Sequence, residues 1–151
     1  MTQVSIYLVA LQKQGLALPE STVAEVIPYE PLQRVQDTPD WFLGLLSWRG
    51  EQVPVASFEM LTVERASFSL VSVASASLVV IKGLNDQADL PFYALVSQTP
   101  PQLIMVEDEM LFATPEAVAR TERAKVRFEN DIVSIPHLDY IEASFRNVLI
   151  T

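Results

Sequence analysis

One arginine in this 151-residue chain stands where it could bind another molecule. Arg49 follows the apolar run WFLGLLSW and precedes Gly50, inside the stretch DWFLGLLSWRGEQVPVASF. The order of these residues predicts two strands joined by a tight turn, with Gly50 at positive φ and Arg49 at the tip. A guanidinium on a rigid tip can bind a partner's carboxylate through two parallel hydrogen bonds. The plain alternative is a solvated arginine on a surface turn.

The other residues that could carry chemistry are not arranged as in an enzyme. Glu107, Asp108 and Glu109 are adjacent acids, which are usually solvated on a turn, and calcium-loop spacing is missing. The single histidine, His137, precedes a helical pattern and is expected to be a packed or capping residue. The sequence has no G-x-S-x-G motif and no cysteine. We therefore predict no catalytic residue, no metal site and no cofactor; a dispersed carboxylate pair stays an open alternative.

The composition is that of an acidic globular protein. Half of the residues are hydrophobic, and 19 acidic residues against 10 basic ones give a net charge of -9. This excess of negative charge disfavours binding to nucleic acid or to an anionic membrane. The apolar run SLVVI is far shorter than the roughly 20 residues of a membrane span, and the N-terminus lacks a signal-peptide pattern. These observations predict a cytoplasmic protein with one domain or two very small barrels.

Period-two alternation dominates the chain and predicts short strands. The first strand, VSIYLVAL, has apolar residues on both faces, which is typical of a strand buried on two sides. Further hairpins are expected for SLVVIKG with FYALVS and for KVRF with DIVSI, and strands LIMV and MLFA flank the acidic turn. The segment AEVIPYEPLQRV is expected to be extended, because its two prolines exclude a long helix.

Short helical segments complete the prediction. Pro19 begins a helical turn, FEMLTV is a candidate for one turn of helix, and Thr114 with Pro115 predicts a helix N-terminus in TPEAVARTERA. An amphipathic C-terminal helix is predicted because apolar residues recur at three- and four-residue spacing: Leu138, Ile141, Phe145 and Val148.

The strands and turns together predict one or two small barrels. The Ser/Ala-rich segment ERASFSLVSVASAS is expected to connect two halves. The stretches SWRGEQVPVASFEML and VRFENDIVSIPHLDYI share one strand, turn and strand pattern, which suggests an internal repeat.

Four short motifs follow one another within residues 4–58: Glu25-Val26, Phe42-Leu43-Gly44-Leu45, Arg49-Gly50 and Val53-Pro54-Val55. In this order and spacing the segment resembles the first half of the CheW-like chemotaxis coupling domain. The second half departs from the family, because FYALVSQTPPQ lacks the usual glycine and acidic residue. Ser47 and Trp48 also stand where the family tends to have Asn and Leu.

The resemblance implies a fold, a function and partners. The implied fold is all-β, with two small SH3-like five-stranded barrels, short helices and a C-terminal amphipathic helix. We expect one domain over residues 1–151, with approximate subdomains 15–65 and 66–135 and the N-terminal strand and C-terminal helix packing across them. The implied function is a non-catalytic adaptor between the cytoplasmic tip of methyl-accepting chemoreceptors and the regulatory domain of a CheA-type histidine kinase. Binding to nucleic acid and direct membrane insertion are not expected, and self-association is left open.

Seven residues form the predicted partner-binding site. In the family, receptor tips dock in the groove between the barrels, and kinase contacts use barrel edges. Five residues match positions implicated in those contacts: Val23, Glu25, Gly44, Arg49 and Gly50. Leu45 and Trp48 join them because exposed apolar area beside Val23 would mark a docking groove. Both tryptophans are nevertheless expected in the core unless the structure exposes them, and Gly44 predicts a bulge or a close backbone approach.

The departures from the family fit a divergent member, such as one that serves a pili-associated system and twitching motility. Two other classes stay open. A small β-barrel enzyme would show a buried carboxylate pair with raised pKa in a closed pocket. A β-barrel binding module unrelated to chemotaxis, such as an oligonucleotide-binding barrel, would show a basic face lined with aromatic residues.

Overall fold

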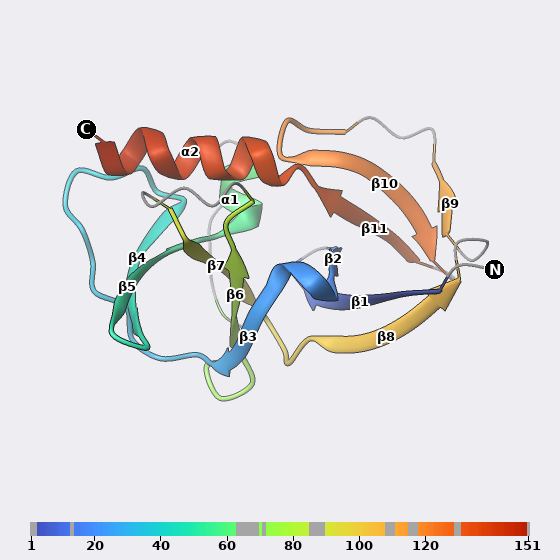
Figure 1. Ribbon diagram of the computed structural model, residues 1–151, viewed down its shortest axis with the longest axis horizontal. Helices are drawn as coiled ribbons and strands as arrows, with labels where there is room; N and C mark the ends of the chain where they lie inside the picture. The colour runs from blue at the N-terminus through green and yellow to red at the C-terminus, as the bar shows by residue number, and fades with distance from the viewer. Residues whose placement is uncertain are drawn as a thin grey trace.

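Strand pairing sorts the elements into two sheets (Figure 1). The computed structural model describes residues 3–12, 14–62, 70, 72–84, 90–107, 111–114, 118–128 and 131–150, with the backbone alone for 111–113 and 150. A six-stranded sheet has the order β8 (Gln102–Glu107), β1 (Gln3–Ala10), β2 (Gly15–Pro19), β11 (Asp131–Pro136), β10 (Glu122–Phe128) and β9 (Leu111–Ala113). A five-stranded sheet has the order β3 (Val23–Pro28), β6 (Ser77–Lys82), β7 (Phe92–Ser97), β5 (Glu51–Ala56) and β4 (Phe42–Trp48).

The two sheets repeat one pattern. The predicted hairpins β4–β5, β6–β7 and β10–β11 are confirmed as antiparallel pairs. In the five-stranded sheet β5 runs parallel to β7, and in the six-stranded sheet β11 runs parallel to β2. In the five-stranded sheet, β7 forms a hairpin with β6, and β3 pairs with the other edge of β6. In the six-stranded sheet, β2 forms a hairpin with β1, and β8 pairs with the other edge of β1. This topology supports the internal repeat suggested by the sequence, and the short strand β9 adds a sixth member to the second sheet.

The helices follow most of the sequence prediction. A 3-10 turn spans Glu20–Thr22, α1 spans Phe58–Thr62, and α2 spans Leu138–Ile150. The helix predicted after Thr114 is wrong in its described part, because residues 118–121 are not helical and β10 follows them directly. There the Ala119 amide donates to Glu122 Oε1 at 2.8 Å and the Glu122 amide donates to the Ala119 carbonyl at 3.0 Å, which closes a tight turn. Residues 115–117 lie outside the described part of the chain.

The predicted subdomain bounds 15–65 and 66–135 do not coincide with the two sheets. Strand β2 belongs to the six-stranded sheet, and β6 and β7 belong to the five-stranded sheet. The five-stranded sheet therefore takes its strands from residues 23–97, and both ends of the chain build the other sheet. The Ser/Ala-rich segment was expected to divide two halves, yet the strands on either side of it, β5 and β6, share one sheet.

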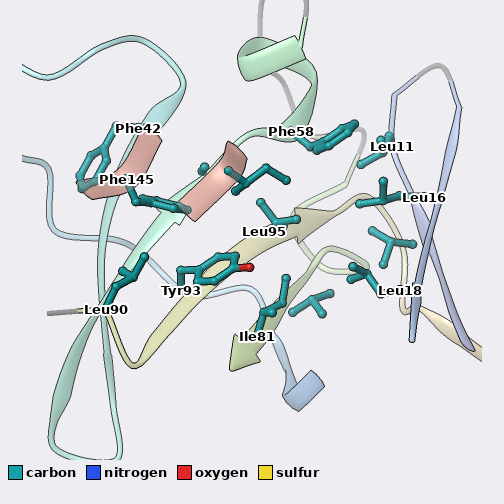
Figure 2. Packing of buried hydrophobic residues seen from close by; sticks show 14 residues of the cluster. Leu11, Leu16, Leu18, Phe42, Phe58, Ile81, Leu90, Tyr93, Leu95 and Phe145 are labelled. Carbon is teal, nitrogen blue, oxygen red and sulfur yellow. The ribbon is translucent and has the colours of Figure 1, made fainter. Parts of the chain in front are cut away.

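Buried apolar side chains form three clusters, one for each sheet and one between them. The first-barrel cluster contains Leu46, Trp48, Val53, Val55, Leu78, Val80, Ala94 and Val96. The second-barrel cluster contains Ile6, Ala17, Val106, Val126 and Val133. The central cluster, shown in Figure 2, draws on both sheets and on α2: Val9, Leu11, Leu16, Leu18, Phe42, Ala56, Phe58, Val79, Ile81, Leu90, Tyr93, Leu95, Ile141 and Phe145.

Strands with two apolar faces separate these clusters. In β6, Val79 and Ile81 point into the central cluster, and Leu78 and Val80 point into the first-barrel cluster. Strand β1 likewise sends Ile6 into the second-barrel cluster and Val9 into the central one, as its sequence predicted. Because successive side chains alternate between the faces of a strand, one strand can serve two cores.

Candidate functional site

The tip of the β4–β5 hairpin has a specific backbone geometry. Trp48 pairs with Glu51, so Arg49 and Gly50 form a two-residue turn. Both turn residues have positive φ, 49° for Arg49 and 79° for Gly50, which is the pattern of a type I′ turn. The prediction for Gly50 is confirmed. The left-handed conformation of Arg49 was not predicted, because this turn normally holds Asn, Asp or Gly at that position.

Arg49 is the exposed member of a cluster of three side chains. Its Nη2 lies 3.1 Å from Oε1 of Glu25, and its side chain is 66% exposed. The indole N–H of Trp48 donates to the same Oε1 at 2.8 Å. The guanidinium carbon lies 4.7 Å from the centroid of the Trp48 ring, within cation–π range. Glu25 thus accepts a hydrogen bond from Trp48 and forms an ion pair with Arg49, and the cluster holds the arginine in place.

Trp48 itself belongs to the interior. It is 7% exposed, lies in the first-barrel cluster and contacts Phe92 edge to face at 4.8 Å between ring centroids. Trp41 is half-buried and stacks edge to face on Phe42 and Phe145. The expectation that both tryptophans pack in or against the core is confirmed.

The sheet must close on itself to assemble this cluster. Glu25 lies on β3 and Trp48 on β4, and these strands are the opposite edges of the five-stranded sheet. The chain after β3 also pairs with β4: the Gln33 amide donates to the Leu45 carbonyl at 2.9 Å, and the Leu45 amide donates to the Gln33 carbonyl at 2.8 Å. The two edges therefore meet in a barrel, and the Glu25 contacts cross the closure.

Gly44 makes this closure possible. Its φ is 144°, and a Cβ at this position would lie 2.6 Å from the Gln33 carbonyl oxygen. The register shifts between Phe42 and Gly44, which marks a β-bulge. The bulge reverses the alternation, so Phe42 points into the central cluster and Leu46 into the first-barrel cluster. Gly44 is buried, and it supports the hairpin from inside.

A second candidate surface lies where the central cluster reaches solvent. In one row of the six-stranded sheet, Leu18 of β2 is buried, Tyr7 of β1 is half-buried and Leu103 of β8 is 51% exposed. Met105, two residues along β8 and on the same face, is 64% exposed. Val23 and Leu45 are half-buried against the central cluster. Strands β3 and β8 run along the same lower side of Figure 1, and α2 lies along the upper side.

We call the set Tyr7, Val23, Leu103 and Met105 the interbarrel face. Sequence reasoning identified only Val23 of these four. The segment QLIMVE could have indicated the other part of this surface. An edge strand with one solvent-facing side normally has polar residues at alternate positions, and here those positions hold Leu103 and Met105.

Buried acids outside the hairpin have structural partners. Glu142 of α2 is fully buried, accepts from the Leu84 amide at 2.9 Å and from the Tyr93 hydroxyl at 3.1 Å, and lies 3.5 Å from Arg146. Burial, together with the charge of Glu142, raises the pKa of the Tyr93 hydroxyl far above its ordinary value. Glu122 accepts hydrogen bonds from Ser134 and from the Ala119 amide.

The sites considered for chemistry have structural roles where the structure describes them. His137 Nδ1 accepts from the Tyr140 amide at 3.1 Å, so this residue caps α2, as predicted. Asp108 and Glu109 lie outside the described residues, and within the described ranges no group of three potential metal ligands occurs. Two open hollows of about 560 and 890 Å³ adjoin the loop at 34–41, and neither is lined by Glu122 or Glu142.

Comparisons with known proteins agree with the fold. The family model described as the CheW-like domain matches residues 5–140. The structure is similar to that of the scaffolding protein TtCheW from Thermoanaerobacter tengcongensis, with a TM-score of 0.73 and 14% sequence identity over 91% of this chain and 86% of that one. The all-β fold of two SH3-like barrels with a C-terminal helix is thereby confirmed. No curated protein matches the chain. No described helix has the length and hydropathy needed to cross a membrane.

Proposed function

The chain belongs to the CheW-like domain family, and on this basis we propose that it is a non-catalytic adaptor that couples chemoreceptors to a CheA-type histidine kinase. One observation carries the proposal furthest: an exposed arginine is held at the tip of a barrel hairpin by Glu25 and Trp48. An arginine with restricted rotamers loses little conformational entropy when a partner binds it.

The proposal assigns two surfaces to two partners. The interbarrel face would receive the receptor tip, because its half-buried members Tyr7 and Val23 pack against the central cluster and its other members, Leu103 and Met105 of the edge strand β8, are exposed and apolar. The hairpin tip around Arg49, with Glu25 beside it, would contact the regulatory domain of the kinase at a barrel edge. Gly44 and Leu45 would support the hairpin from the barrel, Gly50 would shape the exposed turn, and Trp48 would act from the interior.

Coupling then follows from binding both partners at once. A receptor conformation that favours one docking geometry binds the complex with one kinase state more tightly than the complex with the other. This difference in affinity shifts the equilibrium between the two states of the bound kinase. Close-packed clusters suit such a coupler, because a packed interior transmits displacement. The proposal includes a cytoplasmic location, and it leaves pilus motility and swimming as alternative outputs.

The test reverses the charge at Arg49. We expect Arg49→Glu to weaken binding to the regulatory domain of the CheA-type kinase from the same organism by at least about tenfold, the usual range for a well-placed interface arginine. Thermal stability should change little, since exposed ion pairs contribute about 0–1 kcal/mol. Binding is measured by calorimetry and stability by thermal unfolding.

Two further variants separate docking from folding. The double variant Glu25→Arg with Arg49→Glu restores an ion pair but places a negative charge at the tip and removes the acceptor of the Trp48 N–H. It should lose about 1–3 kcal/mol of unfolding free energy, remain folded and still bind poorly. The control Arg127→Glu changes an exposed cation on β10 and should bind normally. Unchanged binding of the Arg49→Glu variant to the kinase regulatory domain would contradict the proposed site.

A further inference from the structure

Trp48 is the residue of the three-residue cluster at the hairpin tip that departs from the family pattern, and it contacts both Glu25 and Arg49. Its ring uses two features at once: the N–H edge donates to Glu25 Oε1, and the face lies under the Arg49 guanidinium. Phe92 contacts the same ring edge to face. Since the ring is 7% exposed, a partner that docks on the surface meets Arg49 and Glu25 rather than Trp48.

The arginine needs such support because of where it sits. Arg49 occupies a left-handed backbone conformation at a turn, and its side chain is 66% exposed. A long exposed side chain samples many rotamers, and a single exposed ion pair restricts it weakly. A flat ring beneath the guanidinium and a carboxylate fixed by that same ring restrict it from two directions.

We propose that Trp48 is a positioning residue, which sets the direction of the Arg49 guanidinium and so selects the partner group that can bind it. The inference rests on the proposed function, because it assumes that Arg49 docks a partner. Oε1 of Glu25 already takes one side of the guanidinium. The partner group that fits is therefore a planar oxygen acceptor, such as a carboxylate, that approaches the remaining N–H groups in the plane set by the indole.

Graded variants of Trp48 separate the two contacts. Trp48→Phe keeps an aromatic ring near Arg49, removes the N–H donor and also shortens a side chain of the first-barrel cluster, so its binding is measured at temperatures where the variant is folded. There, binding to the kinase regulatory domain should weaken by about fivefold to tenfold. Trp48→Leu also removes the ring, and should weaken binding by roughly another fivefold. Glu25→Gln keeps the acceptor but removes the charge, and should resemble the Trp48→Phe variant. The control Trp41→Phe lies outside the tip and should bind as the unsubstituted protein does.

A spectroscopic readout distinguishes positioning from general stability. In a Trp41→Phe background, the only indole N–H resonance in a proton–nitrogen spectrum belongs to Trp48. We expect it to be shifted downfield and protected from exchange with water, and to move upfield in the Glu25→Gln variant. The Arg49 side-chain nitrogen should relax as a rigid group in the parent and as a mobile group in the Trp48→Leu variant, at temperatures where both are folded.

The outcomes separate the two claims. If the parent protein binds neither the kinase regulatory domain nor the receptor tip, the proposed function is overturned, and this inference with it. If the parent binds but Trp48→Phe and Trp48→Leu bind equally well while folded, the inference alone is overturned. Weakened binding together with a mobile Arg49 in a folded Trp48→Leu variant supports it.

Discussion

At the scale of single residues, backbone strain and side-chain contacts meet at the hairpin tip. An L-residue in the left-handed region is disfavoured by roughly 1–2 kcal/mol, and Arg49 adopts that region. The contacts of its exposed side chain with Glu25 and Trp48 offset part of this strain. Strained residues that persist in a fold often cluster at functional sites, which agrees with a docking role for the tip.

Gly44 and Gly50 provide a matched test of two different requirements for glycine. Both have positive φ, but a Cβ on Gly44 would meet the Gln33 carbonyl at 2.6 Å, whereas a Cβ on Gly50 would meet nothing within 4 Å. We expect Gly44→Ala to lower the free energy of unfolding by about 2–4 kcal/mol and Gly50→Ala by about 1 kcal/mol. Chemical denaturation measures both, and equal losses would contradict the bulge assignment.

At the scale of elements, α2 is fastened to the five-stranded sheet by a buried polar contact within an apolar interface. Ile141 and Phe145 enter the central cluster, and Glu142 between them accepts from Tyr93 of β7 and from the amide of Leu84. A buried carboxylate without such partners would be strongly destabilising. The contact therefore fixes one position of α2 against the sheet.

The hydroxyl of Tyr93 makes stability depend on pH in the alkaline range. Its pKa is raised above the ordinary value of 10.0, first by burial and then by Glu142, so the folded state keeps this proton while the unfolded state loses it. The contribution of the Tyr93 hydroxyl to the free energy of unfolding is fully present below pH 10. Above pH 10 the free energy of unfolding should fall as pH rises, by up to about 1.4 kcal/mol per pH unit for one proton.

Tyr93→Phe removes this dependence. We expect the variant to lose about 1–2 kcal/mol of unfolding free energy near pH 7, where the hydrogen bond to Glu142 is missing, and to lose less with rising pH than the parent. Denaturant titrations between pH 8 and about pH 11.5 measure the slope. The control Tyr140→Phe leaves Tyr93 in place and should keep the slope of the parent.

At the scale of the whole molecule, contacts between the barrels hold both candidate surfaces on one frame. The central cluster joins the sheets, and polar contacts add to it: the hydroxyls of Thr62 and Thr121 lie 2.6 Å apart, and the Ala10 amide donates to Ser97 Oγ at 3.1 Å. The interbarrel face and the Arg49 tip are thus parts of one packed body, as a coupler requires.

Met105→Asp tests the interbarrel face separately from the tip. Met105 is 64% exposed, so the change should alter the free energy of unfolding by less than about 0.5 kcal/mol. A charge in an apolar docking surface should weaken binding of the receptor tip by at least about tenfold and leave kinase binding unchanged. Val118→Asp, at another exposed apolar position, is the control. Equal receptor binding by both variants would remove β8 from the proposed surface.

The sequence by itself determined the local structure. Alternation identified β1, β6, β7 and the three hairpins, and the Arg-Gly pair identified the turn, because these features depend on backbone preferences of neighbouring residues. The family motifs led to Arg49 and Glu25 as candidates. Local patterns failed after Thr114, where a side-chain contact of Glu122 closes a turn in a segment with helical signals.

The tertiary structure alone decided which distant groups meet. No local pattern indicates that Glu25 accepts from Trp48 and pairs with Arg49, since these contacts arise only when the edges of a five-stranded sheet close over Gly44. No local pattern indicates either that β2, which lies within the expected subdomain 15–65, pairs with β11 in the other sheet. The physical reason is that strand pairing is non-local: a strand offers the same alternation to any neighbour, and burial of the shared central cluster selects among the neighbours.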